Sequence, residues 1–386
     1  MKRNIIKKIL FAFLLAVTVV VGFVGGYCGY IIFSYDRIGN VDLDVTSISL
    51  IEELSVNHPY SATTYNVGFG AYSQDYTFFL DTGYDIDGNE TCGYYSTVRS
   101  EEEAIFNING SVSAIKELNP DFVLLQEVDV KSTRSYNINQ NQMFFDGLKY
   151  YDNVFSCNFD TAYLPYPLYD MHGKAYAGLS TFSRYKIEEA YRVEYTISDS
   201  LSKLFDIDRC FSVSVLKVSN GKKLYLVNSH MSAYDKGGTI REKQIAELNQ
   251  FLSECKKDGH YVIVGGDFNH DLITNNPNYD YNNNNKPFQN VLRDPDWVAA
   301  YFDDNGKSPL IDGYRVVAAD NAPTCRNNDI EWNPDLTYKC VVDGFIVSDN
   351  VEILVNYNVV TKNGSLGIDG FAYSDHQPAY IEFKLK

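Results

Sequence analysis

Two short segments of this chain place acids beside other polar side chains. Residues 265–270 read Gly-Gly-Asp-Phe-Asn-His, and residues 373–378 read Tyr-Ser-Asp-His-Gln-Pro. Asp267 and Asn269 are two positions apart, so they point to the same face of an extended segment. Asp375 supplies a hard oxygen ligand directly before His376, a proton acceptor. Hydrolysis of a phosphate ester needs a divalent ion, a base for water and donors for charged oxygens, and these residue types supply them.

Three further segments end a short apolar run with a polar side chain. They are residues 64–68 (Thr-Tyr-Asn-Val-Gly), 122–129 (Phe-Val-Leu-Leu-Gln-Glu-Val-Asp) and 224–230 (Leu-Tyr-Leu-Val-Asn-Ser-His). The pattern predicts buried strands that deliver Asn66, Glu127 and His230 at their C-terminal ends. Polar groups at strand ends can converge on one rim of a sheet, where a ligand reaches them.

In this order the motifs resemble a known family. The series Tyr-Asn, Leu-Gln-Glu, Asn-x-His, Gly-Asp-x-Asn, Asp-Gly-Phe-Ile-Val-Ser and Ser-Asp-His-x-Pro is similar to that of the endonuclease/exonuclease/phosphatase superfamily. That superfamily includes pancreatic-type deoxyribonucleases, abasic-site endonucleases, neutral sphingomyelinases and inositol-polyphosphate 5-phosphatases. Each motif alone is weak, whereas six in the family's order are specific. The resemblance covers residues 59–386 and implies an α/β fold, a four-layered α/β/β/α sandwich of two mixed β-sheets.

The residue pattern favours the same architecture. The sequence predicts many strands but only three or four helices, which is typical of a two-sheet sandwich and not of a doubly wound parallel sheet. Apolar spacing predicts helices over residues 101–119, 143–148 and 239–255, and a brief helix within residues 47–56. The asparagine-rich segment 275–287 predicts a loop.

The resemblance implies a magnesium site. Glu127 matches the family's main magnesium carboxylate, with Asn66 beside it as a neutral oxygen ligand and Asp375 near the same ion. Magnesium takes few protein oxygens and keeps several waters, so this small set suits Mg²⁺, with Mn²⁺ as an alternative.

The resemblance also assigns the groups that act on the phosphate. His376 faces it as a base or as a charged stabiliser, and Asp343 orients the ring of His376. Asp267 orients or deprotonates the attacking water, and Asn269 donates to a phosphate oxygen. His230 donates to the oxygen that gains charge in the transition state. The residue after Asp343 is a glycine, where the family usually has a larger side chain.

Two arginines are candidates for contacting the substrate phosphate. Arg184 ends a Ser-Arg segment similar to one in the family, and Arg209 precedes a predicted strand. A structural salt bridge is the alternative for each.

The N-terminus predicts a membrane anchor. Residues 1–8 form a basic tail without acids, and residues 9–33 carry no charge. That segment is longer than the roughly 20 residues needed to cross a hydrocarbon core. The basic flank should stay in the cytoplasm and the rest outside, giving a single-pass protein with residues 34–58 as a linker and 59–386 as the catalytic domain. A cleaved signal peptide is the alternative, although its apolar region is usually shorter.

Charge and cysteine content restrict the function further. The net charge of −17 argues against an extended electrostatic grip on nucleic acid, but it does not exclude a nuclease that relies on a metal and a few local bases. No Cys/His zinc spacing occurs. Outside the cytoplasm disulfides are permitted, and Cys325–Cys340 is the first pair to test.

The sequence therefore predicts a membrane-anchored, magnesium-dependent enzyme that hydrolyses a phosphodiester or phosphomonoester by metal-assisted attack of water. Its substrate is a nucleic acid, a phospholipid head group or a small phosphoester, and no protein partner is expected. A secreted-type nuclease acting on DNA or RNA is one alternative. A catalytically inactive binding protein on the same fold is another.

Overall fold

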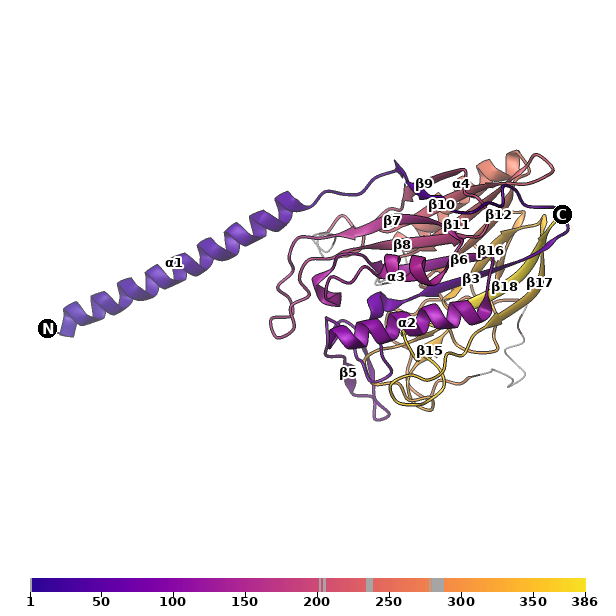
Figure 1. Ribbon diagram of the computed structural model, residues 1–386. Coiled ribbons are helices and arrows are strands. Elements are labelled where there is room, and N and C mark those ends of the chain that lie inside the picture. Colours follow the sequence, from indigo (N-terminus) through magenta and orange to yellow (C-terminus); the bar gives the residue numbers. More distant parts are fainter. Residues whose placement is uncertain (1, 201–202, 204–205, 234–238, 278, 280–287) are drawn as a thin grey trace.

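A computed structural model describes residues 2–386 apart from 201–202, 204–205, 234–238, 278 and 280–287. A long N-terminal helix, α1 (Lys2–Ser34), extends away from a domain built on two seven-stranded sheets (Figure 1). Part of the asparagine-rich segment 275–287 lies outside the described residues.

The first sheet contains most of the N-terminal half of the domain and its last two strands. Its order is β17 (Val351–Asn358), β18 (Ala379–Leu385), β3 (Pro59–Asn66), β6 (Phe122–Asp129), β8 (Tyr176–Ser183), β7 (Asp152–Asp160) and β2 (Val45–Thr46). Only β3 and β6 are parallel neighbours, and every other pair within this sheet is antiparallel.

The second sheet has a matching arrangement. Its order is β1 (Val41–Asp42), β9 (Glu189–Glu194), β10 (Cys210–Lys217), β11 (Lys223–His230), β12 (Tyr261–Asp267), β16 (Asp343–Ser348) and β13 (Tyr314–Val317). Here β11 and β12 are the one parallel pair. Both sheets are thus mixed, as the sequence predicts.

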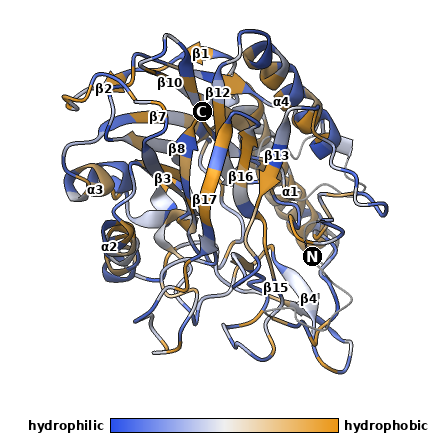
Figure 2. Cartoon of the chain, turned by 90° about the vertical axis from the view of Figure 1, so that its right-hand side faces the viewer, coloured by the Kyte–Doolittle hydropathy of each residue, from blue (hydrophilic) through white to orange (hydrophobic). Residues whose placement is uncertain are grey.

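Helices cover the outer face of each sheet. Figure 2 shows α2 (Glu101–Leu118) and α3 (Gln140–Gly147) on one side of the domain and α4 (Thr239–Lys257) on the other. Strand β6 explains the layering, because its side chains alternate: Phe122 and Leu124 pack between the sheets, whereas Val123 and Leu125 pack under α2 and α3. A strand buried on both faces reads as a continuous apolar run, which is why residues 122–125 lack polar alternation. The predicted four-layered α/β/β/α sandwich is confirmed.

Helix α2 shows how local sequence sets an element's limits. The side chain of Ser100 accepts a hydrogen bond from the backbone N–H of Glu103 and so caps the first turn. Ile108, Val112 and Ile115 recur at helical spacing and are buried against the first sheet. The helix ends at Asn119, which adopts a left-handed conformation that asparagine tolerates.

The segment between α1 and β3 differs from the prediction of a brief helix. Residues 47–56 form no helix, since the carboxylate of Asp152 accepts the backbone N–H groups of Ile48 and Ser49. Leu54 donates its N–H to Lys217 and is fully buried between the sheets. With β1 joined to the second sheet and β2 to the first, the predicted linker 34–58 is packed as part of the domain.

Two short strand pairs lie outside the main sheets. One is β4 (Thr82–Tyr84) with β5 (Glu90–Cys92), and the other is β14 (Cys325–Arg326) with β15 (Lys339–Cys340). In the second pair Cys325 lies directly opposite Cys340, and both are free thiols in this structure. A disulfide between them stays a prediction.

Candidate active site

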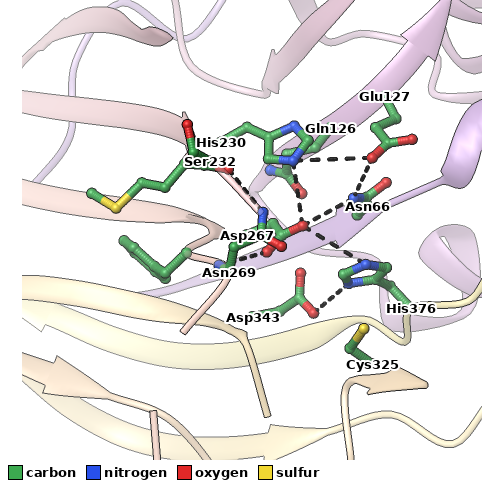
Figure 3. A network of polar contacts seen from close by, with 12 residues as sticks. Asn66, Gln126, Glu127, His230, Ser232, Asp267, Asn269, Cys325, Asp343 and His376 are labelled. Atoms are coloured by element: carbon green, nitrogen blue, oxygen red, sulfur yellow. Dashed lines mark hydrogen bonds and ion pairs between the residues drawn. The ribbon is translucent and has the colours of Figure 1, made fainter. Parts of the chain in front are cut away.

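Two pairs of parallel strands create the site. In the first sheet Asn66 on β3 is opposite Gln126 on β6, and in the second His230 on β11 is opposite Asp267 on β12. The connection from β3 to β6 contains helix α2, and the connection from β11 to β12 contains helix α4. The carboxyl ends of parallel neighbours lie at the same edge, so Asn66, Glu127, His230 and Asp267 face one another where the two sheets meet (Figure 3).

Asp267 is the centre of this network. Its Oδ2 accepts a hydrogen bond from Asn66 Nδ2 at 3.1 Å and lies 3.5 Å from His230 Nε2 and 3.7 Å from His376 Nε2. Its Oδ1 accepts the backbone N–H of Asn269 at 2.9 Å. Burial raises the pKa of Asp267 to about 6, although the imidazole of His376 opposes the shift. A carboxylate with such a pKa can accept and return a proton near neutral pH.

Asp343 holds His376. The distance between Asp343 Oδ2 and His376 Nδ1 is 2.7 Å. Asp343 begins β16 opposite Asp267, and an antiparallel bridge to Cys325 fixes the backbone of His376. Burial opposes a charged ring, but the nearby acids, led by Asp343, outweigh it and raise the pKa of His376 well above its usual value. The ring is therefore positively charged and presents its Nε2 to Asp267.

His230 is in the opposite charge state. Burial and then the positive charge of Arg209 lower the pKa of His230 well below its usual value, so its ring is neutral. Its Nε2 is 4.0 Å from Glu127 Oε1. Its Nδ1 has no hydrogen-bond partner among the described residues. A neutral imidazole here can donate an N–H without adding charge.

A bulge sets the position of Glu127. The pairing of β6 with β8 shifts between Leu125 and Val128, and Glu127 has a φ of 56°. Such a bulge redirects a side chain out of the regular alternation. Glu127 Oε1 accepts a hydrogen bond from Asn66 Nδ2 at 3.1 Å, and its side chain remains partly exposed to the cavity. Burial, followed by the charge of Asp375, raises the pKa of Glu127.

Asp375 is positioned by two residues to which the sequence analysis assigns no role. Its Oδ2 accepts a hydrogen bond from Asn328 Nδ2 at 2.8 Å, and its Oδ1 accepts one from Ser374 Oγ at 3.2 Å. Asn328 also donates to Asp81 at 3.0 Å. Ser374 stands within the Ser-Asp-His motif and was detectable there, whereas Asn328 and Asp81 come from irregular loops that carry no periodic signal.

The side-chain amides of Asn66 and Asn269 are oriented differently from what their predicted roles require. Asn66 directs its nitrogen toward Glu127 and Asp267, while its Oδ1 accepts the backbone N–H of Gly68. Ligation of a metal by this oxygen requires the amide to turn over. Asn269 donates its Nδ2 to the carbonyl of Met231 at 2.8 Å, so one of its two N–H donors is already used.

The structure separates the two predicted arginines. Arg209 lines the cavity, where its Nη1 donates to the carbonyl of Met231 at 2.9 Å. Arg184 follows β8 at the far end of the first sheet, where its Nε donates to Tyr151 Oη at 2.7 Å and its Nη1 lies 3.9 Å from Asp121. Asp121 precedes β6, whereas Glu127 stands near that strand's other end. The prediction that Arg184 contacts the substrate phosphate is therefore wrong, and its structural alternative holds.

Two other cations lie at the cavity and were missed. Arg134 pairs with Asp129 at 2.8 Å and stands over the ring of Phe69, 3.9 Å from its centre. Arg326 is 1% exposed and donates its Nη2 to the carbonyl of Ser73. Its Nε and Nη1 have no hydrogen-bond partner among the described residues. Buried guanidinium donors without partners suit an anionic group.

The polar network opens into a cavity of about 640 Å³. The cluster supplies its floor, including Glu127, Asp267, Asp375 and His376. Small-molecule sites commonly have volumes of roughly 300–1,000 Å³, so the cavity is large enough for a phosphate ester.

The sequence profile of the Endonuclease/Exonuclease/phosphatase family matches residues 104–376, most of the chain. The chain belongs to this family. The match confirms the predicted resemblance and, with it, the predicted class: the protein is a hydrolase of phosphate esters. None of the curated proteins compared with the chain matches it significantly.

Solved structures of the family share its fold. A D. rerio TDP2 complexed with a single-strand DNA product has a TM-score of 0.51 and 17% identity, covering 85% of this chain and 100% of that one. ANGEL2, a 2′,3′-cyclic phosphatase, has a TM-score of 0.50 and 16% identity, covering 89% of this chain and 98% of that one. A family protein from Leptotrichia buccalis C-1013-b has a TM-score of 0.50 and 14% identity, covering 84% and 100%.

The residues at the family's site fit a divalent ion. Glu127, Asp267 and Asp375 offer carboxylate oxygens to one cavity. Candidate ligand atoms of Asp267, Asp343 and His376 lie within 4.8 Å of one another, although the last two residues already bind each other. Grouped acids repel one another, and a cation between them removes that repulsion. Oxygen donors of this kind suit Mg²⁺ and Mn²⁺.

Proposed function

We propose that the protein is a magnesium-dependent phosphoesterase, anchored in a membrane by residues 9–33, with its catalytic domain outside the cytoplasm. The observation that carries the enzymatic part is the arrangement around Asp267. A charged His376, a neutral His230 and the carboxylate of Glu127 surround it on the floor of one cavity. Groups held in different protonation states around one phosphate are what acid–base hydrolysis needs.

Each residue has a defined task in this proposal. Glu127 and Asp375 would hold a divalent ion, which would neutralise charge on the phosphate and lower the pKa of bound water. Asp267 takes a proton from the attacking water. The imidazolium of His376, held by Asp343, stabilises the charge that develops on the phosphate oxygens.

Three further residues complete the phosphate site. His230 and Asn269 donate N–H groups to the phosphate oxygens. Arg209, which lines the same cavity, adds a fixed positive charge. Asn66 keeps Glu127 and Asp267 in place, since its Nδ2 donates to both carboxylates.

The anchor rests on the length and composition of α1. Residues 4–34 form the one described helix that is long and apolar enough to cross a membrane. Lys2, Arg3, Lys7 and Lys8 lie before or at the start of its uncharged part, and the bias toward cytoplasmic basic residues places the C-terminal domain on the outer side.

Turnover of a generic substrate tests the function. Purified full-length protein in detergent should hydrolyse bis(4-nitrophenyl) phosphate or 4-nitrophenyl phosphate with Mg²⁺. Activity should disappear in EDTA and in Glu127→Ala but persist in Glu352→Ala, a matched change of an exposed glutamate on β17. A panel of DNA, RNA, phospholipids and nucleotides then ranks the substrates. A folded protein without activity on any of these compounds favours the inactive binding protein.

A further inference from the structure

The cavity changes character between its floor and its mouth. The floor is the buried polar cluster described above. We call the apolar part of the lining the mouth, because Leu80 and Tyr166 in it are exposed; Phe79 packs against Tyr166 there. A fully polar phosphate ester would make no favourable apolar contact with these side chains. A molecule with a phosphate at one end and hydrocarbon at the other matches both parts.

The N-terminal helix contributes directly to the cavity wall. Tyr27, Cys28 and Ile31 of α1 line it, and Ile31 is only 6% exposed. The hydroxyl of Tyr27 donates to the carbonyl of Tyr163, in the connection between β7 and β8. Beyond the helix, Tyr35 Oη donates to Asp208 at 2.9 Å. The helix end is thus fastened beside the entrance.

The position of these residues along α1 places the entrance at a membrane surface. A hydrocarbon core about 30 Å thick takes about 20 helical residues. Counted from Ile9, the first residue after the basic tail, that length ends near Cys28. Tyr27 and Ile31 therefore lie at the outer boundary of the bilayer, and tyrosine is enriched at this depth.

Exposed apolar side chains lie on the chain segments that contribute Leu80 and Tyr166 to the cavity. They come from the segment around β4 and β5 and from the β7–β8 connection, and we call them the rim: Leu80, Tyr94, Tyr163, Tyr166, Leu168 and Tyr169. Leu168 is 76% exposed and Tyr166 is 65% exposed. Contiguous exposed apolar surface of this kind marks an interaction site.

The rim is one connected surface. The rings of Tyr94 and Tyr169 stack with centroids 4.8 Å apart, and Tyr169 Oη donates to the carbonyl of Tyr94 at 3.0 Å. Phe79, inside the mouth, packs edge-on against Tyr166 at 5.7 Å. The two segments of the rim therefore contact each other, and Tyr163 of the rim also contacts Tyr27 of α1.

We propose that the rim sits on the outer leaflet of the membrane that holds α1, and that the substrate is a phosphodiester lipid of that leaflet. The lipid's phosphate reaches the polar floor while its hydrocarbon stays among the rim and the bilayer. Water adds to phosphorus, the P–O bond to one of the two alcohols breaks, and that alcohol leaves with the proton released from the water. The inference rests on the proposed phosphoesterase function, because it assigns a substrate class to the same site.

The rest of the molecule agrees with a lipid in preference to a nucleic acid. A net charge of −17 opposes approach of a polyanion. It equally opposes docking on an anionic surface, so the anchor supplies the contact that electrostatics does not. Zwitterionic lipids are therefore the appropriate probe.

The test uses full-length protein reconstituted into vesicles of phosphatidylcholine and phosphatidylethanolamine, with bis(4-nitrophenyl) phosphate as the soluble comparison. The variant is Leu168→Ser/Tyr169→Ser, whose residues are exposed and do not line the cavity. The matched control is Tyr150→Ser/Leu354→Ser, two exposed apolar residues outside the rim. We expect the rim variant to lose about tenfold in lipid hydrolysis and to stay within about twofold on the soluble diester, while the control keeps both.

The outcomes separate this proposal from the function on which it rests. Hydrolysis of the soluble diester without hydrolysis of either vesicle lipid overturns the lipid substrate and leaves the phosphoesterase standing. Lipid hydrolysis that falls equally in the rim variant and the control overturns the role of the rim. If the wild-type protein hydrolyses neither the vesicle lipids nor the soluble diester, the proposed phosphoesterase function itself is overturned. Preferential cleavage of DNA or RNA, unaffected by the rim variant, also contradicts the proposal.

Discussion

The two histidines beside Asp267, His230 and His376, differ in charge. His376 is paired with Asp343 and surrounded by further acids, which raises its pKa. Burial, the charge of Arg209 and the charged ring of His376 together lower the pKa of His230. The site therefore contains a cation and a neutral donor of the same chemical type, and each should respond differently to substitution.

Removing the charged histidine should affect turnover most. We expect His376→Ala to lower kcat by at least about a hundredfold, the lower end for loss of an acid–base group. Asp343→Asn should cost less, because it disturbs the orientation and charge of the ring without removing it. Steady-state kinetics on bis(4-nitrophenyl) phosphate would measure both, and an unchanged kcat in His376→Ala would contradict the role given to this residue.

Glu127→Gln should act on the metal and not on the proton transfers. The substitution keeps the shape and removes the negative charge, so the Mg²⁺ concentration needed for half-maximal activity should rise at least about tenfold, while saturating Mg²⁺ restores much of kcat. A Mg²⁺ titration of activity gives both quantities. Equal half-saturation in the variant and the wild type would remove Glu127 from the metal site.

Substitutions of the two predicted arginines should affect different properties: stability in the case of Arg184 and catalytic activity in the case of Arg209. Arg184→Met should lower the free energy of unfolding by about 1 kcal/mol, since it removes an exposed ion pair and a contact with Tyr151, and should leave kcat/KM unchanged. Arg209→Lys, which keeps the charge but not the fork of donors, should lower kcat/KM. Urea denaturation and kinetics on the same preparations test the pair. Loss of activity without loss of stability in Arg184→Met would reverse our correction.

At the scale of elements, the site depends on contacts that cross from one sheet to the other. Asn228 on β11 is fully buried and accepts a hydrogen bond from Gln126 Nε2 at 2.7 Å. Its own Nδ2 donates to the carbonyls of Leu125 and Ser180 at 3.0 and 3.1 Å. This one side chain joins the strands that carry Glu127 and His230.

Asn228→Ala should therefore destabilise the domain strongly. It leaves buried donors and acceptors of the first sheet unpaired, so we expect a loss of about 2–4 kcal/mol in the free energy of unfolding. Asn109→Ala, an exposed position in α2, should change stability little. Urea midpoints of the two variants provide the comparison, and similar midpoints would show that the inter-sheet bonds matter less than their burial indicates.

The sequence predicts the interior strands of this fold well and its margins poorly. Strands such as β6 and β12 are buried on both faces and read as apolar runs, and their ends carry the motif residues. Strands β1 and β2 are each two residues long, too short for any periodicity, and β17 is an edge strand with mixed exposure. The bulge at Glu127 and the loop partner Asn328 depend on pairing between distant segments, so local pattern cannot predict them.

At the scale of the whole molecule, the arrangement of α1 and the domain makes a topological prediction. With the basic tail in the cytoplasm, the domain lies outside. Protease added to intact cells should remove it and leave a short membrane fragment, whereas a cytoplasmic control protein stays intact. Protection of the domain, or a mature N-terminus near residue 34, would contradict the uncleaved anchor.

The cavity at the end of α1 also shows where sequence reading stops. Length and charge predict the anchor, and the motifs predict the catalytic residues, but neither predicts that Ile31 and His376 line the same cavity. That relation arises because residues 35–58 pack across both sheets and do not form a free linker.

The position of β3 has a consequence for how the protein is made. This strand is among the first of the domain to be synthesised, yet it lies between β6 and β18, the last strand. Asp343 and His376 also leave the ribosome late, long after Glu127 and Asp267. Contacts between such distant segments form slowly. A growing chain therefore has an unfinished first sheet and lacks His376 until residues 376–385 have been made, so the order of the strands delays assembly of the site.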